Sequence, residues 1–446
     1  MLEAFGPNVV TAEGKEYSFH VRITSPPFSD QNGANDLVWK ETAHQTEELT
    51  KAWERDNDRG LHLDVNSLTL AVISLTGFGR SVEWTSRKQE DQKPPAGYKI
   101  SFLKAIHDTT GYIIVILLFP RWFLNLTPWR EAAVAHQQLE TYMRELVRSE
   151  KAAISLNSEH QSTTAKGNLL TSLLKVSAAE GAAPSTDPHN KKKSFTEDEV
   201  MGNLFLYLLA GYETTANAIL YALIVLALRS DIQLKIRKEI QDVDAEAKSQ
   251  GREVLTYSTD FEKFRYTYGF MYETFRLYPG GIIVTKMINE ANSIIVSSTT
   301  DPTAPPEKYM LPKDCRVYLN APAVHYTERY WPNPELLDPS RWDSIITAPG
   351  KEDVDTSKKV VAADKTRQVR GTLLTFSGGG RACLGRKFAQ SEFISFLVTL
   401  LRDHDVVLGE GMDPKKVQRD IDLRSAGRLT LSPLDDIKLG LKKRAV

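Results

Sequence analysis

One cysteine lies in a glycine-rich segment of this 446-residue chain. The sequence there reads Phe376-Ser-Gly-Gly-Gly-Arg-Ala-Cys-Leu-Gly385, and residues 386–401 follow with helical spacing. Glycines permit a tight turn in which several backbone N–H groups converge, and the start of a helix stabilises negative charge. We therefore expect the pKa of Cys383 to be lowered and its thiolate to act as a nucleophile or as a metal ligand.

The neighbours of Cys383 bear on this choice. A cysteine nucleophile needs a base, usually histidine, and no histidine is near it in the sequence, although one could approach it in space. Gly385 leaves room for a flat ligand against the helix, and Arg381 is placed to meet an acidic group of that ligand. A buried structural cysteine and a phosphate-binding loop are the alternatives, but no Gly-Lys-Ser/Thr follows at Walker spacing.

A second candidate segment is Ala210-Gly-Tyr-Glu-Thr-Thr215, inside a long apolar run. The Thr214 hydroxyl can bond back to the carbonyl of Ala210, four residues earlier, and open the helix there. Gly211 would leave space beside that opening, and Glu213 is placed to relay protons from solvent. Small and hydroxyl residues also serve helix packing alone, which remains the alternative.

A charged pair, Glu273 and Arg276, is spaced three residues apart on one predicted helix face. Alone, such a pair is usually a solvated surface contact worth about 0–1 kcal/mol. A further arginine, Arg341, lies in the stretch Asp338-Pro-Ser-Arg-Trp342.

The elements that must position these residues are mostly helices. Thr196 and Glu199 predict a capping box that opens a helix running to about Arg229. At 1.5 Å per residue, some 30 residues span roughly 45–50 Å, so this helix should cross the core. Short strands are predicted at 282–287, 293–297 and 316–319, and a hairpin of 428–432 with 437–441. The fold class is therefore mainly α with minor β.

Composition limits the function classes. With 41% hydrophobic residues and a formal net charge of −1, the composition is that of a globular protein without a basic field for nucleic acid. The length allows either two to three domains or one large enzyme domain. Irregular stretches are expected at 177–193 and 347–371. Two cysteines exclude a disulfide scaffold.

The aromatic, arginine-containing region 112–130 suits either peripheral membrane contact or a buried helix end.

The cysteine segment resembles the haem-binding loop of the cytochromes P450, Phe-x-x-Gly-x-Arg-x-Cys-x-Gly, with Phe376, Gly379, Arg381, Cys383 and Gly385 at the fixed positions. Segment 210–215 is similar to the family's oxygen-activation motif. Glu273, Arg276 and Arg341 are similar to its buried structural network. The resemblance, nearest to fungal enzymes of the microsomal type, implies the P450 fold: a single catalytic domain over 1–446, helical with small antiparallel sheets.

That resemblance also implies haem b, with Cys383 as the axial ligand of the iron and with Ala210 and Gly211 against the cofactor. It implies electrons from an NADPH–cytochrome P450 reductase and insertion of one oxygen atom from O2 into a lipophilic small molecule, in secondary metabolism. Glu213 and Thr214 would deliver protons. Ile282, Ile283 and Val284 would line the substrate site, and the enzyme would reside at the cytosolic face of the endoplasmic reticulum membrane.

The chain departs from the family pattern at three places. The usual Trp-x-x-x-Arg is Tyr17 to Val21 here, so His20 or Arg22, one position to either side, is the candidate to replace the arginine near the haem. Lys286 stands where an arginine often binds a propionate, and it lacks the planar fork. The chain is also expected to be N-terminally truncated, with neither the membrane anchor nor the first strands of family members.

These departures leave two alternative functions open. One is a degenerate haem-binding fragment without turnover. The other is a P450 that rearranges or dehydrates an oxygenated substrate without a reductase, against which the Glu213–Thr214 pair argues because that chemistry needs no proton delivery to O2.

Overall fold

The computed structural model describes residues 3–55, 61–81, 94–157, 168–182, 194–296, 305–342, 371–426 and 430–444. Most of the two irregular stretches expected from the sequence, 183–193 and 347–370, lies outside these residues. Residues 177–182 are not irregular, because they form the end of helix α8 (Leu169–Ala182). Leu173, Leu174 and Ser177 of α8 are buried, and the Ser177 hydroxyl accepts a hydrogen bond from the Phe195 N–H at 2.7 Å.

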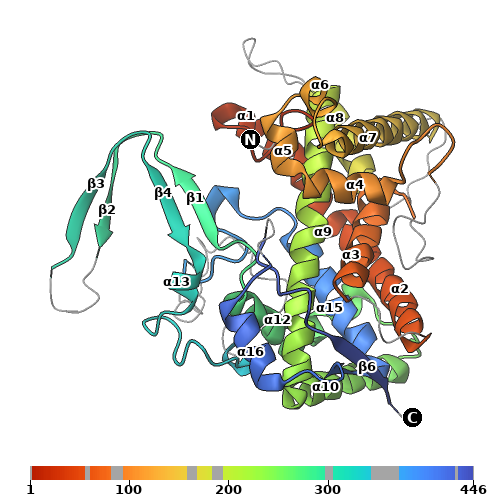
Figure 1. The fold of residues 1–446 in the computed structure, drawn as a ribbon, viewed down its shortest axis with the longest axis vertical. Helices are drawn as coiled ribbons and strands as arrows, with labels where there is room; N and C mark the ends of the chain where they lie inside the picture. The colour runs from red at the N-terminus through yellow and green to blue at the C-terminus, as the bar shows by residue number, and fades with distance from the viewer. Residues whose placement is uncertain are drawn as a thin grey trace.

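Helix α9 (Glu197–Leu228) crosses the whole molecule (Figure 1). Its predicted capping box is confirmed, since Thr196 accepts from the Glu199 N–H and Glu199 accepts from the Thr196 N–H. Among the described residues it is the one helix long and apolar enough to span a membrane, but 78% of its most apolar window is buried inside the protein. It is therefore placed as the core helix of the fold.

The other helices surround α9. Those of the first half are α1 (Gly14–Thr24), α2 (Ala34–Arg55), α3 (Leu61–Phe78), α4 (Phe102–Gly111), α5 (Ile113–Leu118), α6 (Arg121–Leu124) and α7 (Arg130–Asn157). Those of the second half are α10 (Ser230–Ser249), α11 (Tyr257–Asp260), α12 (Arg265–Leu277), α13 (Ala321–His325), α15 (Arg386–Asp403) and α16 (Pro414–Leu423). Short 3-10 turns include η1 (Pro26–Phe28), η2 (Asp30–Asn32), η4 (Phe261–Lys263), η5 (Pro339–Trp342) and η6 (Gly379–Arg381). Helix α15, which follows the cysteine segment, lies against α2, α9 and α10.

In the described part of the chain the strands form three two-stranded antiparallel sheets. They are β1 (Ile283–Met287) with β4 (Arg316–Asn320), β2 (Asn292–Val296) with β3 (Glu307–Leu311), and β5 (His404–Leu408) with β6 (Leu439–Lys443). The fold class expected from the sequence is thereby confirmed. The sheets β1–β4 and β2–β3 stand away from the helical body (Figure 1).

The predicted hairpin of residues 428–432 with 437–441 is wrong, because the last strand has a different partner. Strand β6 pairs with β5, which directly follows α15, and not with residues near 430. Gln233 of α10 bonds both backbone groups of Val406 in β5, at 3.0 and 2.8 Å, and so holds this strand against the core beside β6. Alternation in a sequence indicates a strand but does not identify the strand with which it pairs.

Candidate active site

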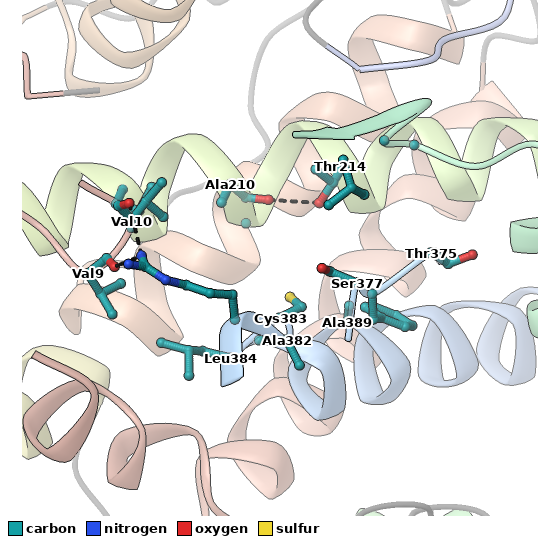
Figure 2. A pocket seen from close by; sticks show the side chains of 18 of the residues that line it. Val9, Val10, Ala210, Thr214, Thr375, Ser377, Ala382, Cys383, Leu384 and Ala389 are labelled. Atoms are coloured by element: carbon teal, nitrogen blue, oxygen red, sulfur yellow. Dashed lines mark hydrogen bonds between the residues drawn. The ribbon is translucent and has the colours of Figure 1, made fainter. Parts of the chain in front are cut away.

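A cavity of about 770 Å³ lies between α9 and the segment that carries Cys383. Ala210, Gly211 and Thr214 line it from α9, and Phe376, Arg381, Cys383 and Gly385 line it from the other side. Figure 2 shows Cys383 and the pair Ala210–Thr214 on opposite walls, with the sulfur directed toward the space between them. The two main sequence motifs therefore meet at one site.

The cysteine segment belongs to a longer loop, residues 371–385, called the cysteine loop below. A hydrogen bond within its own backbone closes this loop. The Cys383 N–H donates to the Phe376 carbonyl at 2.9 Å. Between them, Ser377 and Gly379 have φ of 58° and 71°, a left-handed conformation that favours glycine. A Cβ at Gly385 would meet only Phe28, at 3.9 Å. The loop thus has open space at Gly385, close to the sulfur.

The pKa of Cys383 is raised, not lowered as the sequence predicted. Burial raises the pKa of this thiol, while the Gly385 N–H and the charge of Arg386 favour the thiolate less strongly. Helix α15 begins at Arg386, with Gly385 as its N-cap, so the sulfur lies just ahead of the helix end, whose effect is weaker than that of burial. The thiolate will dominate when a metal ion bonds it, because a coordinating thiol is deprotonated.

The cavity favours metal ligation over nucleophilic catalysis. No histidine is among the described residues that line it, so the sulfur has no evident base there. The described residues also contain no cluster of three His, Cys, Asp or Glu side chains that could hold a metal ion by themselves. A metal bonded to Cys383 would therefore arrive within a larger cofactor.

The opposite wall has the expected bond from side chain to backbone, but α9 continues as an α-helix through it and the predicted opening of the helix is not seen. The Thr214 hydroxyl donates to the Ala210 carbonyl at 2.7 Å. Gly211 serves packing as well as access, because a Cβ there would lie 3.2 Å from two carbons of Ile73 in α3. The glycine therefore lets α3 approach α9 at the level of the cavity.

Glu213 is held behind this wall by a residue that the sequence analysis missed. Its carboxylate accepts from the backbone N–H and the hydroxyl of Thr430, both at 3.2 Å. The Thr430 hydroxyl in turn accepts from Asn217 at 2.7 Å. Glu213 is not among the cavity-lining residues, so it lies one step further out than Thr214. No local signal marks Thr430, which is 217 positions from Glu213.

The predicted charged network is present and buried. Arg276 donates to both oxygens of Glu273, at 3.0 and 2.7 Å, and Arg341 donates to the same carboxylate at 3.0 Å. The Trp342 indole N–H and the Asp338 backbone N–H also donate to Glu273, at 2.9 and 3.1 Å. Glu273 and Arg276 are fully buried, so this is a core network and not a surface pair.

Arg381 lines the cavity, but its guanidinium already has partners. It donates to the backbone carbonyls of Val9, Val10 and Ala12, at 3.2, 3.2 and 2.6 Å. It also lies over the ring of Tyr17, 3.6 Å from the centroid. The sequence did not predict these contacts with the N-terminal segment, whereas the expected contact of Arg381 with an acidic ligand stays a prediction.

The two candidates in α1 are placed differently. Tyr17 lines the cavity, and its hydroxyl donates to the Gly380 carbonyl of the cysteine loop. His20 is not among the cavity-lining residues, and it is buried against α9, with Asn203 at 3.3 Å and Glu199 at 3.5 Å. Burial lowers the pKa of His20. It therefore contacts the core helix and not the cavity.

The other candidates lie on and just before strand β1. Val284 and Lys286 line the cavity, as do Thr285 and Met287, so residues from both faces of the strand contribute to its wall. Ile283 is 54% exposed, and Ile282, just before the strand, is 46% exposed. Neither isoleucine is among the cavity-lining residues, contrary to expectation. Arg316 of β4 does line the cavity, and the sequence analysis did not single it out.

The sequence did not indicate that α15 carries a buried carboxyl group, that of Glu392. Glu392 is fully buried, and neither oxygen has a hydrogen-bond partner within the usual distance. Burial raises its pKa well above the usual value, and nearby Thr215 opposes this only in part. Glu392 is therefore expected to be protonated in the folded protein at neutral pH.

Replacing Glu392 by glutamine is expected to stabilise the protein at pH 7.5. The unfolded chain loses the glutamate proton near pH 4.5 while the folded protein keeps it, so wild-type stability falls as pH rises above that value. Each pKa unit of difference is worth about 1.4 kcal/mol, and glutamine escapes this loss. Urea unfolding of wild type and Glu392→Gln at pH 5 and 7.5 measures the difference in free energy of unfolding. A gain in stability that does not grow with pH would contradict the prediction.

Comparisons with known proteins agree on one family. A family model described as "Cytochrome P450" matches residues 3–431. "Cytochrome P450 monooxygenase prx9" of Penicillium rubens is 55% identical over 446 residues, covering 100% of this chain and 75% of that protein. "Cytochrome P450 monooxygenase ORF6" of Penicillium roqueforti is 55% identical over 447 residues with the same coverage.

Solved structures agree in fold. The structure titled "Retinoic acid bound cyanobacterial CYP120A1" matches with a TM-score of 0.67 and 18% identity, over 99% of this chain and 82% of that one. The structure titled "Crystal structure of a Cytochrome P450 (CYP102L1)" matches with a TM-score of 0.67 and 21% identity, over 99% and 86%. At these identities the likeness concerns the fold alone.

Proposed function

The chain belongs to the cytochrome P450 family, and on this premise we propose that it is a haem-thiolate monooxygenase that inserts one oxygen atom from O2 into a lipophilic small molecule. The observation that carries the proposal is the placement of the Cys383 thiol and the Thr214–Ala210 bond on opposite walls of one cavity (Figure 2). Within one catalytic domain, this arrangement supplies a metal ligand on one side and a proton-relay hydroxyl on the other.

The residues present fit haem b. Gly385 leaves open space close to the sulfur, as a flat macrocycle requires. Lys286, Arg316 and Arg381 line the cavity and bring positive charge for acidic substituents. Cys383 would bind the iron, with Phe376 and Gly379 shaping the loop and Tyr17 steadying Arg381. When bound, haem supplies the redox chemistry that activates O2.

The protein's own part in the reaction is proton movement and exclusion of water. Thr214 faces the cavity with its hydroxyl bonded to a helix carbonyl, so it can hold a proton donor at the site of O2 reduction. Glu213 lies behind it, bonded to Thr430, and would supply protons to Thr214 from the solvent side. Ile73, Leu206 and Val284 give the cavity an apolar lining that suits a lipophilic substrate.

The electron donor is proposed to be an NADPH–cytochrome P450 reductase at the cytosolic face of the endoplasmic reticulum. Supporting this location, α5, α6 and the turn after them carry exposed apolar side chains, including Trp122 at 68% and Leu126 at 81% exposure. The same region buries Ile113, Ile116 and Leu124, so one face joins the protein and the other is free to enter a membrane surface.

The test of the proposal is optical and then kinetic. The chain loaded with hemin, reduced and exposed to CO should show the red-shifted Soret band of thiolate ligation, and with reductase and a substrate it should consume NADPH. A band typical of a neutral thiol or histidine would favour a degenerate haem-binding fragment. Substrate rearrangement without NADPH would instead favour the reductase-independent isomerase or dehydratase.

Thr214→Ala is expected to keep the thiolate band and to lower the product formed per NADPH by at least about tenfold, since positioned proton transfer contributes about 10²–10⁴-fold. The measurement is product, NADPH consumed and H2O2 released in one assay. Thr214→Ser, which keeps the hydroxyl, is the matched control and should stay near wild type. Unchanged coupling in the alanine variant would remove the proton role from Thr214.

A further inference from the structure

His325 joins two parts of the site that are far apart in the sequence. It ends α13 and is fully buried. Its Nδ1 lies 2.9 Å from the Arg276 carbonyl at the end of α12, and its Nε2 accepts from the Leu374 N–H in the cysteine loop at 2.8 Å. One imidazole thus contacts both the helix of the Glu273 network and the loop that carries Cys383.

The two contacts fix the protonation of the ring. A backbone N–H can only donate, so Nε2 must be unprotonated opposite Leu374. A carbonyl can only accept, so the ring proton must be on Nδ1, opposite Arg276. Burial, and next the charge of Arg276, lower the pKa of His325 to about 4, which keeps the ring neutral at physiological pH.

The ring is held firmly from the side of the network. Arg276, which is bonded to Glu273, also donates to the backbone carbonyl of His325 at 2.8 Å. Arg276 and His325 therefore each donate to the backbone carbonyl of the other. His325 takes its position from the buried network and not from a mobile surface segment.

Leu374, which the ring contacts, is itself bonded into the loop that carries Cys383. The Leu374 carbonyl accepts from the Ser377 N–H at 2.9 Å, and Phe376 accepts from the Cys383 N–H at 2.9 Å. The neighbouring Thr375 hydroxyl donates to the Phe275 carbonyl of α12 at 3.1 Å. A continuous set of bonds thus runs from Arg276 through His325 and Leu374 to the backbone of Cys383.

We propose that His325 is a positioning residue that holds the cysteine loop, and with it the Cys383 sulfur, in register with the buried Glu273–Arg276 network. The proposal rests on the proposed function, because it assigns to His325 the orientation of the metal ligand. Imidazole suits this task because it presents a donor and an acceptor on two edges of one rigid ring.

Two variants of His325 test its hydrogen bonds to Leu374 and to Arg276 separately. In His325→Gln, the longer side chain can place an oxygen near the Nε2 position and accept from Leu374. In His325→Asn, the shorter side chain can place an amide nitrogen near the Nδ1 position and donate to Arg276, but cannot reach Leu374. Hydrogen exchange of the Leu374 amide, in the full chain with and without haem, is the direct readout. We expect exchange about tenfold faster in the asparagine variant and near wild type in the glutamine variant.

Spectroscopy of the haem-loaded variants gives the functional readout. The thiolate band of the CO complex should convert several-fold faster to the neutral-thiol form in His325→Asn than in His325→Gln, with urea midpoints of the two variants alike. Equal exchange of Leu374 in both variants, or conversion rates that merely follow the urea midpoints, would overturn the proposal. The exchange test in the haem-free chain is independent of catalysis, so its failure is distinguishable from failure of the proposed function.

Discussion

Replacing Cys383 by alanine should abolish the red-shifted Soret band of the reduced CO complex and all measurable oxygenase turnover. The sulfur is directed into the cavity opposite Thr214, and no other cysteine or histidine is among the described cavity-lining residues. No described neighbour can therefore replace it as iron ligand. Absorbance spectra and product formation at matched haem content measure the loss.

Cys315→Ala is the matched control. This second cysteine lies next to β4 and is not among the cavity-lining residues, and its thiol makes a weak contact with the Arg316 carbonyl, at 3.7 Å. It should leave both the band and the turnover unchanged. Retention of the thiolate band in Cys383→Ala, or its loss in Cys315→Ala, would contradict the assignment of the ligand.

Replacing Glu273 by alanine should destabilise the protein by about 3–5 kcal/mol, because it leaves buried charge without its partner. Arg276 is fully buried, and its guanidinium would keep only backbone carbonyls as acceptors. Arg341, Trp342 and Asp338 would each lose a hydrogen bond as well. Urea unfolding of the haem-free chain measures the loss of stability, and haem retention should fall with it.

Glu253→Ala, at an exposed carboxylate, is the control and should change the free energy of unfolding by less than about 0.5 kcal/mol. Glu273→Gln, which keeps the shape but not the charge, should fall between the control and the alanine variant. If Glu273→Ala unfolded like the control, the network would have no structural role.

The sequence predicted the site best where a motif is local. The capping box of α9, the Thr214–Ala210 bond and the Glu273–Arg276 pair involve residues three or four positions apart, a spacing that helix geometry alone brings together. The general fold class followed from the same periodicity. These features depend on few distant contacts.

The sequence failed where distant segments compete for one group. Arg381 lines the cavity, but its bonds to the carbonyls of the N-terminal segment were not predicted. His20 was expected near the cavity, but Asn203 and Glu199 of α9 hold it in the core. The lowered pKa expected for Cys383 is reversed because burial outweighs the helix end. These contacts and this pKa depend on burial and on residues distant in the sequence, which motifs of a few neighbouring residues do not specify.

The bonds from Arg381 to Val9, Val10 and Ala12 bear on the order in which the protein can mature. They join residues 369 to 372 positions apart, so this contact cannot form before the chain between its two ends has been made. Such long-range closure is slow relative to local helix formation. The helices between residues 12 and 381 can therefore form first, and the cavity wall that Arg381 ties to the N-terminal segment is completed late in folding.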